Sequence, residues 1–236
     1  MVHLCPEQIR RFHEDGYLVL PSLFAFDEIA WVRDEAQAVA LRQVPRDPWP
    51  EEAPEGAIYG AHRAEPVFRR LAAHPRLVRA ARELLDTAPY IHQTRLLPWR
   101  SAASTEARFR RDAQAWSSLD GLVESRAVTA AVVLEDSAYG SPLSVVPGSH
   151  RDPVASAPLS LEAGLGTVVL LDANLSYALG RAGDRPYPRL YLVSFNAATN
   201  ALATTPRGAP YAAAGAEALI EEADDCLWPT PWCAAG

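Results

Sequence analysis

An apolar run at residues 128–134 constrains the fold of this chain more than any other stretch. Such a run is expected of a strand that is covered on both faces. Residues 167–172 and 189–196 have the same character, and residues 90–97 alternate as a half-buried strand does. Strands of this kind lie at the centre of a sheet. The sequence therefore predicts a mainly β core.

Helices are expected around this core. Residues 6–14 form a short amphipathic segment with proline at the first turn, where the missing N–H is tolerated. Asp27 offers an N-cap to a segment with apolar residues at helical spacing through about residue 42. Residues 66–85 predict two helices that separate near His74, because proline disfavours a helical residue before it.

Length and composition predict one domain over residues 1–236, with 49% apolar residues and a formal net charge of −7. An acidic chain lacks the basic face that nucleic acid needs, and no apolar run is long enough for a membrane span. The first residues lack the features of a signal peptide, and the three cysteines form no even disulfide set. We therefore expect a cytoplasmic protein. The sequence contains no lysine, which excludes Schiff-base chemistry.

Four short motifs carry a family resemblance. They read Asp-Gly-Tyr at 15–17, His-Gln-Thr-Arg at 92–95, Arg-Arg-Asp at 110–112 and Pro-Gly-Ser-His at 147–150. In this order and spacing they resemble the phytanoyl-CoA dioxygenase superfamily, and most closely its ectoine-hydroxylase branch. The resemblance implies a double-stranded β-helix (jelly roll, cupin-like) with flanking helices. It also implies an enzyme scaffold that uses Fe(II), 2-oxoglutarate and O2.

The resemblance also implies where the site residues stand. The family binds iron through a His-x-Asp pair and a second histidine far downstream. Here Asp112 matches the carboxylate, Arg110 stands at the first histidine position, and Tyr177 stands at the second. Arg189 matches the arginine that holds 2-oxoglutarate. We expect the remaining substrate contacts from Gln93, Arg95, Trp116 and Arg126.

The residues at the three iron-ligand positions, Arg110, Asp112 and Tyr177, favour a metal-independent enzyme with no cofactor. A guanidinium group has no lone pair to offer a metal, and a phenol binds metal only as the phenolate. We expect Arg110 to keep Asp112 ionised, Asp112 to act as a base, and Tyr177 to move a proton. The expected reaction is an isomerisation, dehydration, cyclisation or C–C cleavage of a small anionic metabolite in bacterial specialised metabolism.

Two alternatives remain. In the first alternative, the chain is an inactive pseudo-dioxygenase that binds a ligand or a protein partner. In the second, it is an Fe(II)/2-oxoglutarate hydroxylase with non-standard ligands. Only the second of these needs iron and 2-oxoglutarate as cofactors. We expect a small anionic metabolite as partner, with no nucleic acid and no membrane. A homodimer stays open.

Overall fold

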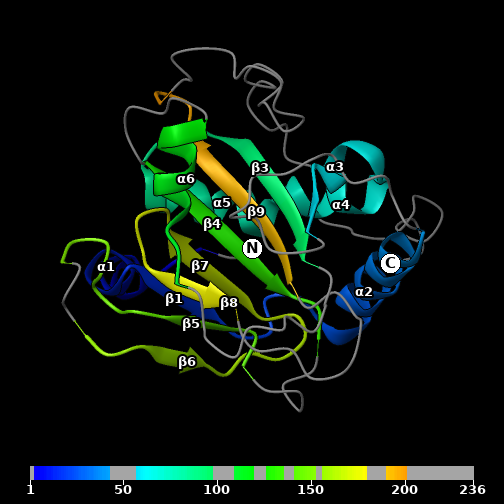
Figure 1. The fold of residues 1–236 in the computed structure, drawn as a ribbon, viewed down its shortest axis with the longest axis horizontal. Coiled ribbons are helices and arrows are strands. Elements are labelled where there is room, and N and C mark those ends of the chain that lie inside the picture. The colour runs from blue at the N-terminus through cyan, green and yellow to red at the C-terminus, as the bar shows by residue number, and fades with distance from the viewer. Residues whose placement is uncertain are drawn as a thin grey trace.

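Two antiparallel sheets form the centre of the computed structural model (Figure 1). The structure describes residues 3–42, 57–97, 109–119, 126–135, 141–152, 156–179 and 190–200. In spatial order the large sheet contains β1 (Tyr17–Leu20), β7 (Val168–Asp172), β4 (Ala127–Val133), β9 (Leu190–Ala197), β3 (Pro89–Leu97) and β2 (Ile58–Tyr59). The small sheet contains β6 (Leu159–Leu161), β5 (Leu143–Val145) and β8 (Tyr177–Leu179).

The middle of the large sheet consists of the apolar segments that the sequence singled out. β4 lies between β7 and β9 and pairs antiparallel with both. Every residue of β4 and β9 is buried, as is expected of strands with both faces covered. On the far side of β9, the pairing with β3 shifts in register between Ile91 and Gln93. Such an irregularity bends a strand and increases its twist locally.

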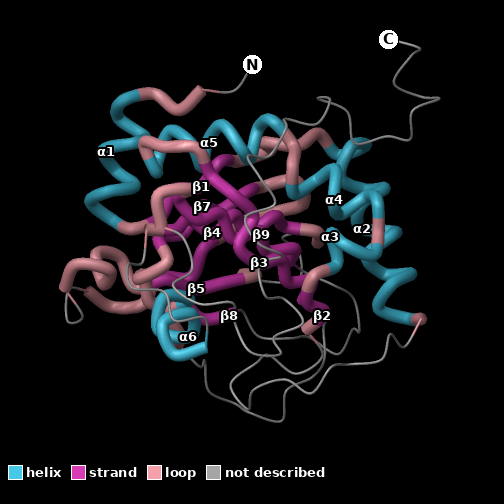
Figure 2. The backbone as a smooth tube through the Cα atoms, turned by 90° about the horizontal axis from the view of Figure 1, so that it is seen from above, coloured by secondary structure: helices cyan, strands magenta, loops and turns pink. Residues whose placement is uncertain are grey.

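Helices cover one face of this sheet. They are α1 (Pro6–Asp15), α2 (Phe26–Leu41), α3 (Ala61–Ala64), α4 (Pro66–Ala72) and α5 (Pro75–Leu85). The remaining helix, α6 (Asp112–Leu119), lies on the side of the small sheet. Figure 2 shows α1, α4 and α5 on one side of the large sheet and β5 and β8 on the other. Proline stands in the first turn of α1, α4 and α5, where no intrahelical N–H is needed. His74 caps α5 by accepting a hydrogen bond from the Arg76 amide, which explains the predicted break.

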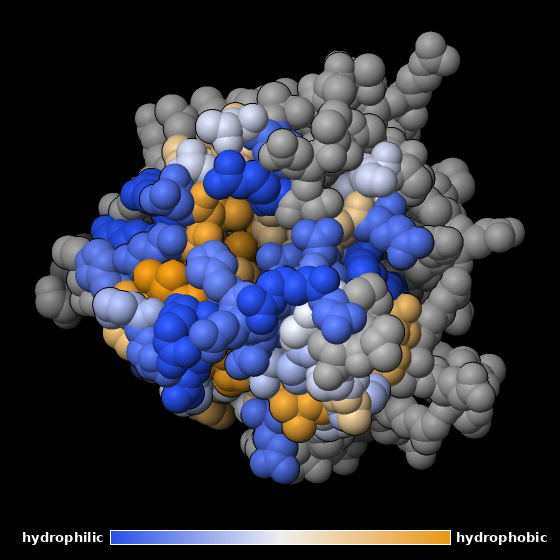
Figure 3. All heavy atoms as spheres, turned by 90° about the vertical axis from the view of Figure 1, so that its left-hand side faces the viewer, coloured by the Kyte–Doolittle hydropathy of each residue, from blue (hydrophilic) through white to orange (hydrophobic). Residues whose placement is uncertain are grey.

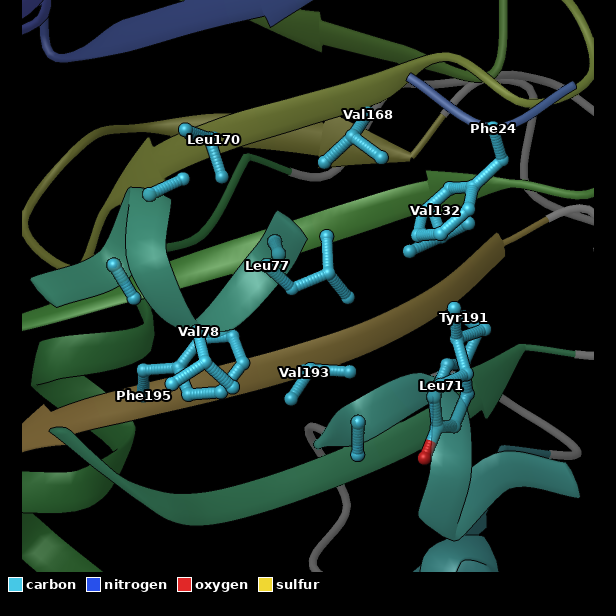
Figure 4. Packing of buried hydrophobic residues seen from close by; sticks show 14 of the residues in the cluster. Phe24, Leu71, Leu77, Val78, Val132, Val168, Leu170, Tyr191, Val193 and Phe195 are labelled. Carbon is cyan, nitrogen blue, oxygen red and sulfur yellow. The ribbon is translucent and has the colours of Figure 1, made fainter. Parts of the chain in front are cut away.

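The helical face of the sheet carries the larger core (Figure 4). Leu77 and Val78 of α5 pack over Val193 and Phe195 of β9. Farther along β9, Tyr191 packs on Phe68 with ring centroids 4.9 Å apart, and its hydroxyl donates to the Phe68 carbonyl at 3.2 Å. Tyr191, Val193 and Phe195 of β9 thus face the helices. The residues that alternate with them, such as Leu190 and Leu192, face the small sheet.

A second core lies between the two sheets. Leu190 and Leu192 of β9 pack there with Val133 of β4 and with Leu143 and Val145 of β5. Two facing antiparallel sheets with a filled interior make up the predicted jelly roll. The expected fold class, mainly β with flanking helices, is confirmed.

Several sequence expectations are met closely, and others fall outside the described residues. The helices predicted at 6–14 and after Asp27 appear as α1 and α2, and the split at His74 separates α4 from α5. Asp27 is not the N-cap of α2, because Ala25 occupies that position and Asp27 lies in the first turn. Arg189, the first residue of the strand expected at 189–196, lies outside the described residues. Within the described ranges, no helix has the length and apolar character needed to cross a membrane. On the face in Figure 3, apolar side chains form separate patches among polar ones.

We expect Gly166→Ala to destabilise the protein more than Gly60→Ala. Both glycines have positive φ, 80° and 66°, so alanine is strained at either position by about 1–2 kcal/mol. At Gly166 an added Cβ also overlaps the Phe24 carbonyl oxygen, whereas at Gly60 the nearest atom is 3.9 Å away. Urea unfolding of both variants measures the difference. Equal losses would contradict the close packing at Gly166.

Candidate functional site

Asp112 is the first residue of α6 and lies in the interior of the jelly roll. Its side chain is only 4% exposed. The next residue, Ala113, is anchored by a backbone hydrogen bond of 2.9 Å to the Ala173 carbonyl, just after β7. A carboxylate in the first turn of a helix is favoured by the partial positive charge of the helix N-terminus. The start of α6 is thus fixed to the strands around it.

Arg95 of β3 holds this carboxylate by two hydrogen bonds. Its Nη1 donates to one oxygen at 2.9 Å and its Nη2 to the other at 2.6 Å. Burial alone would raise the pKa of Asp112, but the charge and hydrogen bonds of Arg95 outweigh it and hold that pKa below its ordinary value. Burial opposes the charge of Arg95 too, yet Asp112 raises the pKa of Arg95. Both partners are therefore ionised.

Two hydroxyl groups complete the shell around Asp112. Thr129 Oγ1 of β4 donates to one carboxylate oxygen at 3.0 Å, and it lies 2.9 Å from Ser194 Oγ on β9. The Tyr177 hydroxyl of β8 donates to the other oxygen at 2.8 Å. Burial raises the pKa of Tyr177, so the phenol stays protonated. Asp112 thereby connects the large sheet, the small sheet and α6.

Arg110 and Tyr177 are joined through their backbones. The Arg110 amide donates to the Tyr177 carbonyl at 2.8 Å, and the Tyr177 amide donates to the Arg110 carbonyl at 3.0 Å. Residues that exchange both hydrogen bonds in an antiparallel pair carry their side chains on the same face. The Arg110 side chain therefore lies on the face from which Tyr177 contacts Asp112.

The structure corrects one predicted contact. Arg110 was expected to be the arginine that holds Asp112 ionised, whereas Arg95 forms that ion pair. Alternation along β3 places Arg95 on the face of the large sheet that looks toward Asp112. A buried arginine on a strand requires a carboxylate partner. This requirement was the sequence signal that could have identified the pair.

The other predicted contacts are scattered. Gln93 is buried on β3, two residues before Arg95. Trp116 is buried in a small core and meets the His92 ring edge-on, with the ring centroids 4.7 Å apart. Arg126 is exposed and donates to the Leu85 carbonyl at 3.4 Å, on the helical side. Arg189 lies outside the described residues.

Sequence reasoning missed Thr129 and Ser194, and it did not commit to a role for His62. The first two are polar residues in otherwise apolar strands, and that interruption was the available signal. His62 of α3 bonds Thr94 Oγ1 at 2.7 Å, beside Arg95 on β3. Burial lowers the pKa of His62 to about 4, so this histidine is neutral at pH 7.

Residues 12–162 match the phytanoyl-CoA dioxygenase (PhyH) family, which is more than half of the chain. The chain belongs to this family. Its relatives include an ectoine dioxygenase from Sphingopyxis alaskensis, 31% identical over 83% of this chain and 76% of the relative. Another, the ectoine dioxygenase of Bordetella bronchiseptica, is 27% identical over 79% of this chain and 73% of the relative.

Solved structures of the S. alaskensis enzyme EctD have the same fold. The structure with 2-oxoglutarate and 5-hydroxyectoine has a TM-score of 0.80 at 28% identity, over 95% of this chain and 89% of EctD. A second EctD structure, with bound Fe, has a TM-score of 0.79. The similarity of fold to EctD thus agrees with the family assignment made from the sequence.

These comparisons contradict the predicted metal-independent enzyme and the predicted absence of cofactors. The relatives are named ectoine dioxygenases, and the similar EctD structures contain Fe or 2-oxoglutarate. The findings point to iron- and 2-oxoglutarate-dependent oxygenases. The prediction was wrong because it inferred the chemistry of the chain from two positions and gave the relationship over the whole scaffold too little weight.

The described residues, however, do not fit an iron ion. Such a site needs two imidazoles and one carboxylate on one face with open positions between them. Here both oxygens of Asp112 already accept hydrogen bonds from Arg95, and Thr129 and Tyr177 add one each. All six histidines of the sequence lie in the described ranges, and those ranges contain no group of three His, Cys, Asp or Glu able to hold a metal.

We expect Asp112→Asn to lower the free energy of unfolding at pH 7 by about 3–5 kcal/mol, because Arg95 would remain buried without a counter-charge. Tyr177→Phe, the milder control, should cost about 1 kcal/mol, since one hydrogen bond is lost. Urea unfolding compares the two. A loss in Asp112→Asn no larger than in Tyr177→Phe would contradict the ion pair.

The same pair predicts a pH dependence. Because the pKa of Asp112 is lowered in the folded state, its stabilisation is fully present above the unfolded-state pKa of about 3.9. It is lost as the pH falls toward the folded-state pKa. Unfolding between pH 5 and pH 2 should therefore show a smaller acid loss in Asp112→Asn than in the unmodified chain.

Proposed function

We propose that this chain binds a small metabolite with a carboxylate group, at the centre formed by Arg95, Arg110, Asp112 and Tyr177. The observation that carries the proposal is the charge balance of these four residues. Two guanidinium groups stand against one carboxylate, and Tyr177 stays neutral. A largely buried centre with one excess positive charge favours an anionic ligand.

The relatives support the same class of ligand. The EctD structure from S. alaskensis contains 2-oxoglutarate, a dicarboxylate, together with 5-hydroxyectoine, which also carries a carboxylate. We carry only this shared chemistry over to the present chain. Gln93, two residues from Arg95, and Arg189 are further proposed ligand contacts.

Calorimetric titration tests the binding. We expect saturable binding of 2-oxoglutarate, succinate or ectoine, and weaker binding at high salt because part of the attraction is electrostatic. The matched control is succinamide, which has the length of succinate without its charge. Absence of binding by all three carboxylates, or equal binding of succinamide, would overturn the proposal.

A second candidate function is iron- and 2-oxoglutarate-dependent oxidation of a small metabolite. The observation that favours it is the 31% identity with an ectoine dioxygenase over most of both chains. This candidate expects O2-dependent conversion of 2-oxoglutarate to succinate that requires added Fe(II) and disappears with a chelator. Succinate formation no higher than in the chelated control would exclude it.

The remaining expectations are predictions with tests of their own. The catalytic roles of Asp112, Tyr177 and Arg110 need kinetic tests, as do the substrate contacts of Trp116 and Arg126. A cytoplasmic location and a homodimer are likewise proposals, which fractionation and light scattering can examine.

A further inference from the structure

We infer that the guanidinium of Arg110, beside the Tyr177 hydroxyl, is the group that receives the carboxylate of the ligand. The inference rests on the proposed function and assigns the ligand's charge to one residue. It places the anion at the position where the family resemblance expects the first iron-binding histidine.

The backbone positions Arg110 for this role. The two hydrogen bonds between Arg110 and Tyr177 hold the residue against β8 and orient both side chains to the same face. The charge of Arg110 is close enough to Tyr177 to oppose the rise in the pKa of Tyr177 that burial causes. Arg110 is thus on the side of the buried centre, and its side chain is half-buried.

Arg110 is left without an acceptor in this centre. Its Nε is buried and has no hydrogen-bond partner, and the Nε of Arg95 is in the same state. Two other arginines, by contrast, have carboxylate partners: Glu28 pairs with Arg76, and Glu7 and Glu14 pair with Arg10. A buried donor without an acceptor is costly, and a bound anion removes that cost.

Asp112 cannot supply the missing acceptor. Arg95 engages both of its oxygens, and Thr129 and Tyr177 donate to them as well. The positive charge of Arg110 therefore remains uncompensated among the described residues. A planar guanidinium matches a carboxylate because two parallel N–H groups meet two oxygens. This geometry favours a small carboxylic acid as the ligand.

Three variants test the assignment by titration with succinate and 2-oxoglutarate. Arg110→Met keeps the length of the side chain and removes its charge, and we expect about ten- to hundredfold weaker binding. Arg110→Lys keeps the charge without the fork and should bind with intermediate affinity. Arg111→Met is the matched control, because neighbours on an extended segment point to opposite sides, and its affinity should be unchanged.

Thermal unfolding without ligand separates binding from structure. Removing an uncompensated positive charge should leave the Tm of Arg110→Met equal to or above that of the unmodified chain. A lower Tm for both Arg110→Met and Arg110→Lys would show a structural role and overturn the inference. Unmodified affinity in Arg110→Met would also overturn it, while the proposed ligand binding would stand. Failure of the unmodified chain to bind any carboxylate, or equal binding of succinamide, would refute the proposed function itself.

Discussion

The buried ion pair between Arg95 and Asp112 is the contact on which the interior of this jelly roll depends. Two unit charges of opposite sign lie in direct contact, with side chains 7% and 4% exposed. Neither could be buried alone, because an unpaired charge in the interior is costly. Because Asp112 begins α6 and Arg95 lies on β3, the same ion pair also fixes the helix to the strand.

The hydroxyl groups around this pair explain why it tolerates burial. A carboxylate that accepts four hydrogen bonds has regained most of what it loses on leaving water. Its donors come from β3, β4 and β8, so the stabilisation of one charge links both sheets. Gln93 and Ser194 extend the polar strip along the inner face of the large sheet, where β3 and β9 pair.

Much of the fold followed from the sequence. Apolar runs identified β4, β7 and β9, and proline positions identified the starts of α1, α4 and α5, because both signals are local. The family resemblance correctly brought Asp112 and Tyr177 together. It did not identify the ion-pair partner: Arg95 is 17 residues before Asp112, and only the curvature of β3 and the position of α6 decide which arginine meets the carboxylate. The prediction of a metal-independent enzyme was wrong for a related reason. Two side chains were judged without the scaffold that surrounds them.

Arg110 and Tyr177 are attached to each other by main-chain atoms alone, through a reciprocal pair of amide–carbonyl bonds. Every amino acid except proline provides the same donor and acceptor. The side chains at both positions can therefore be exchanged during evolution while the strands keep their connection. A scaffold with this property can alter the chemical character of its innermost point and still preserve its shape.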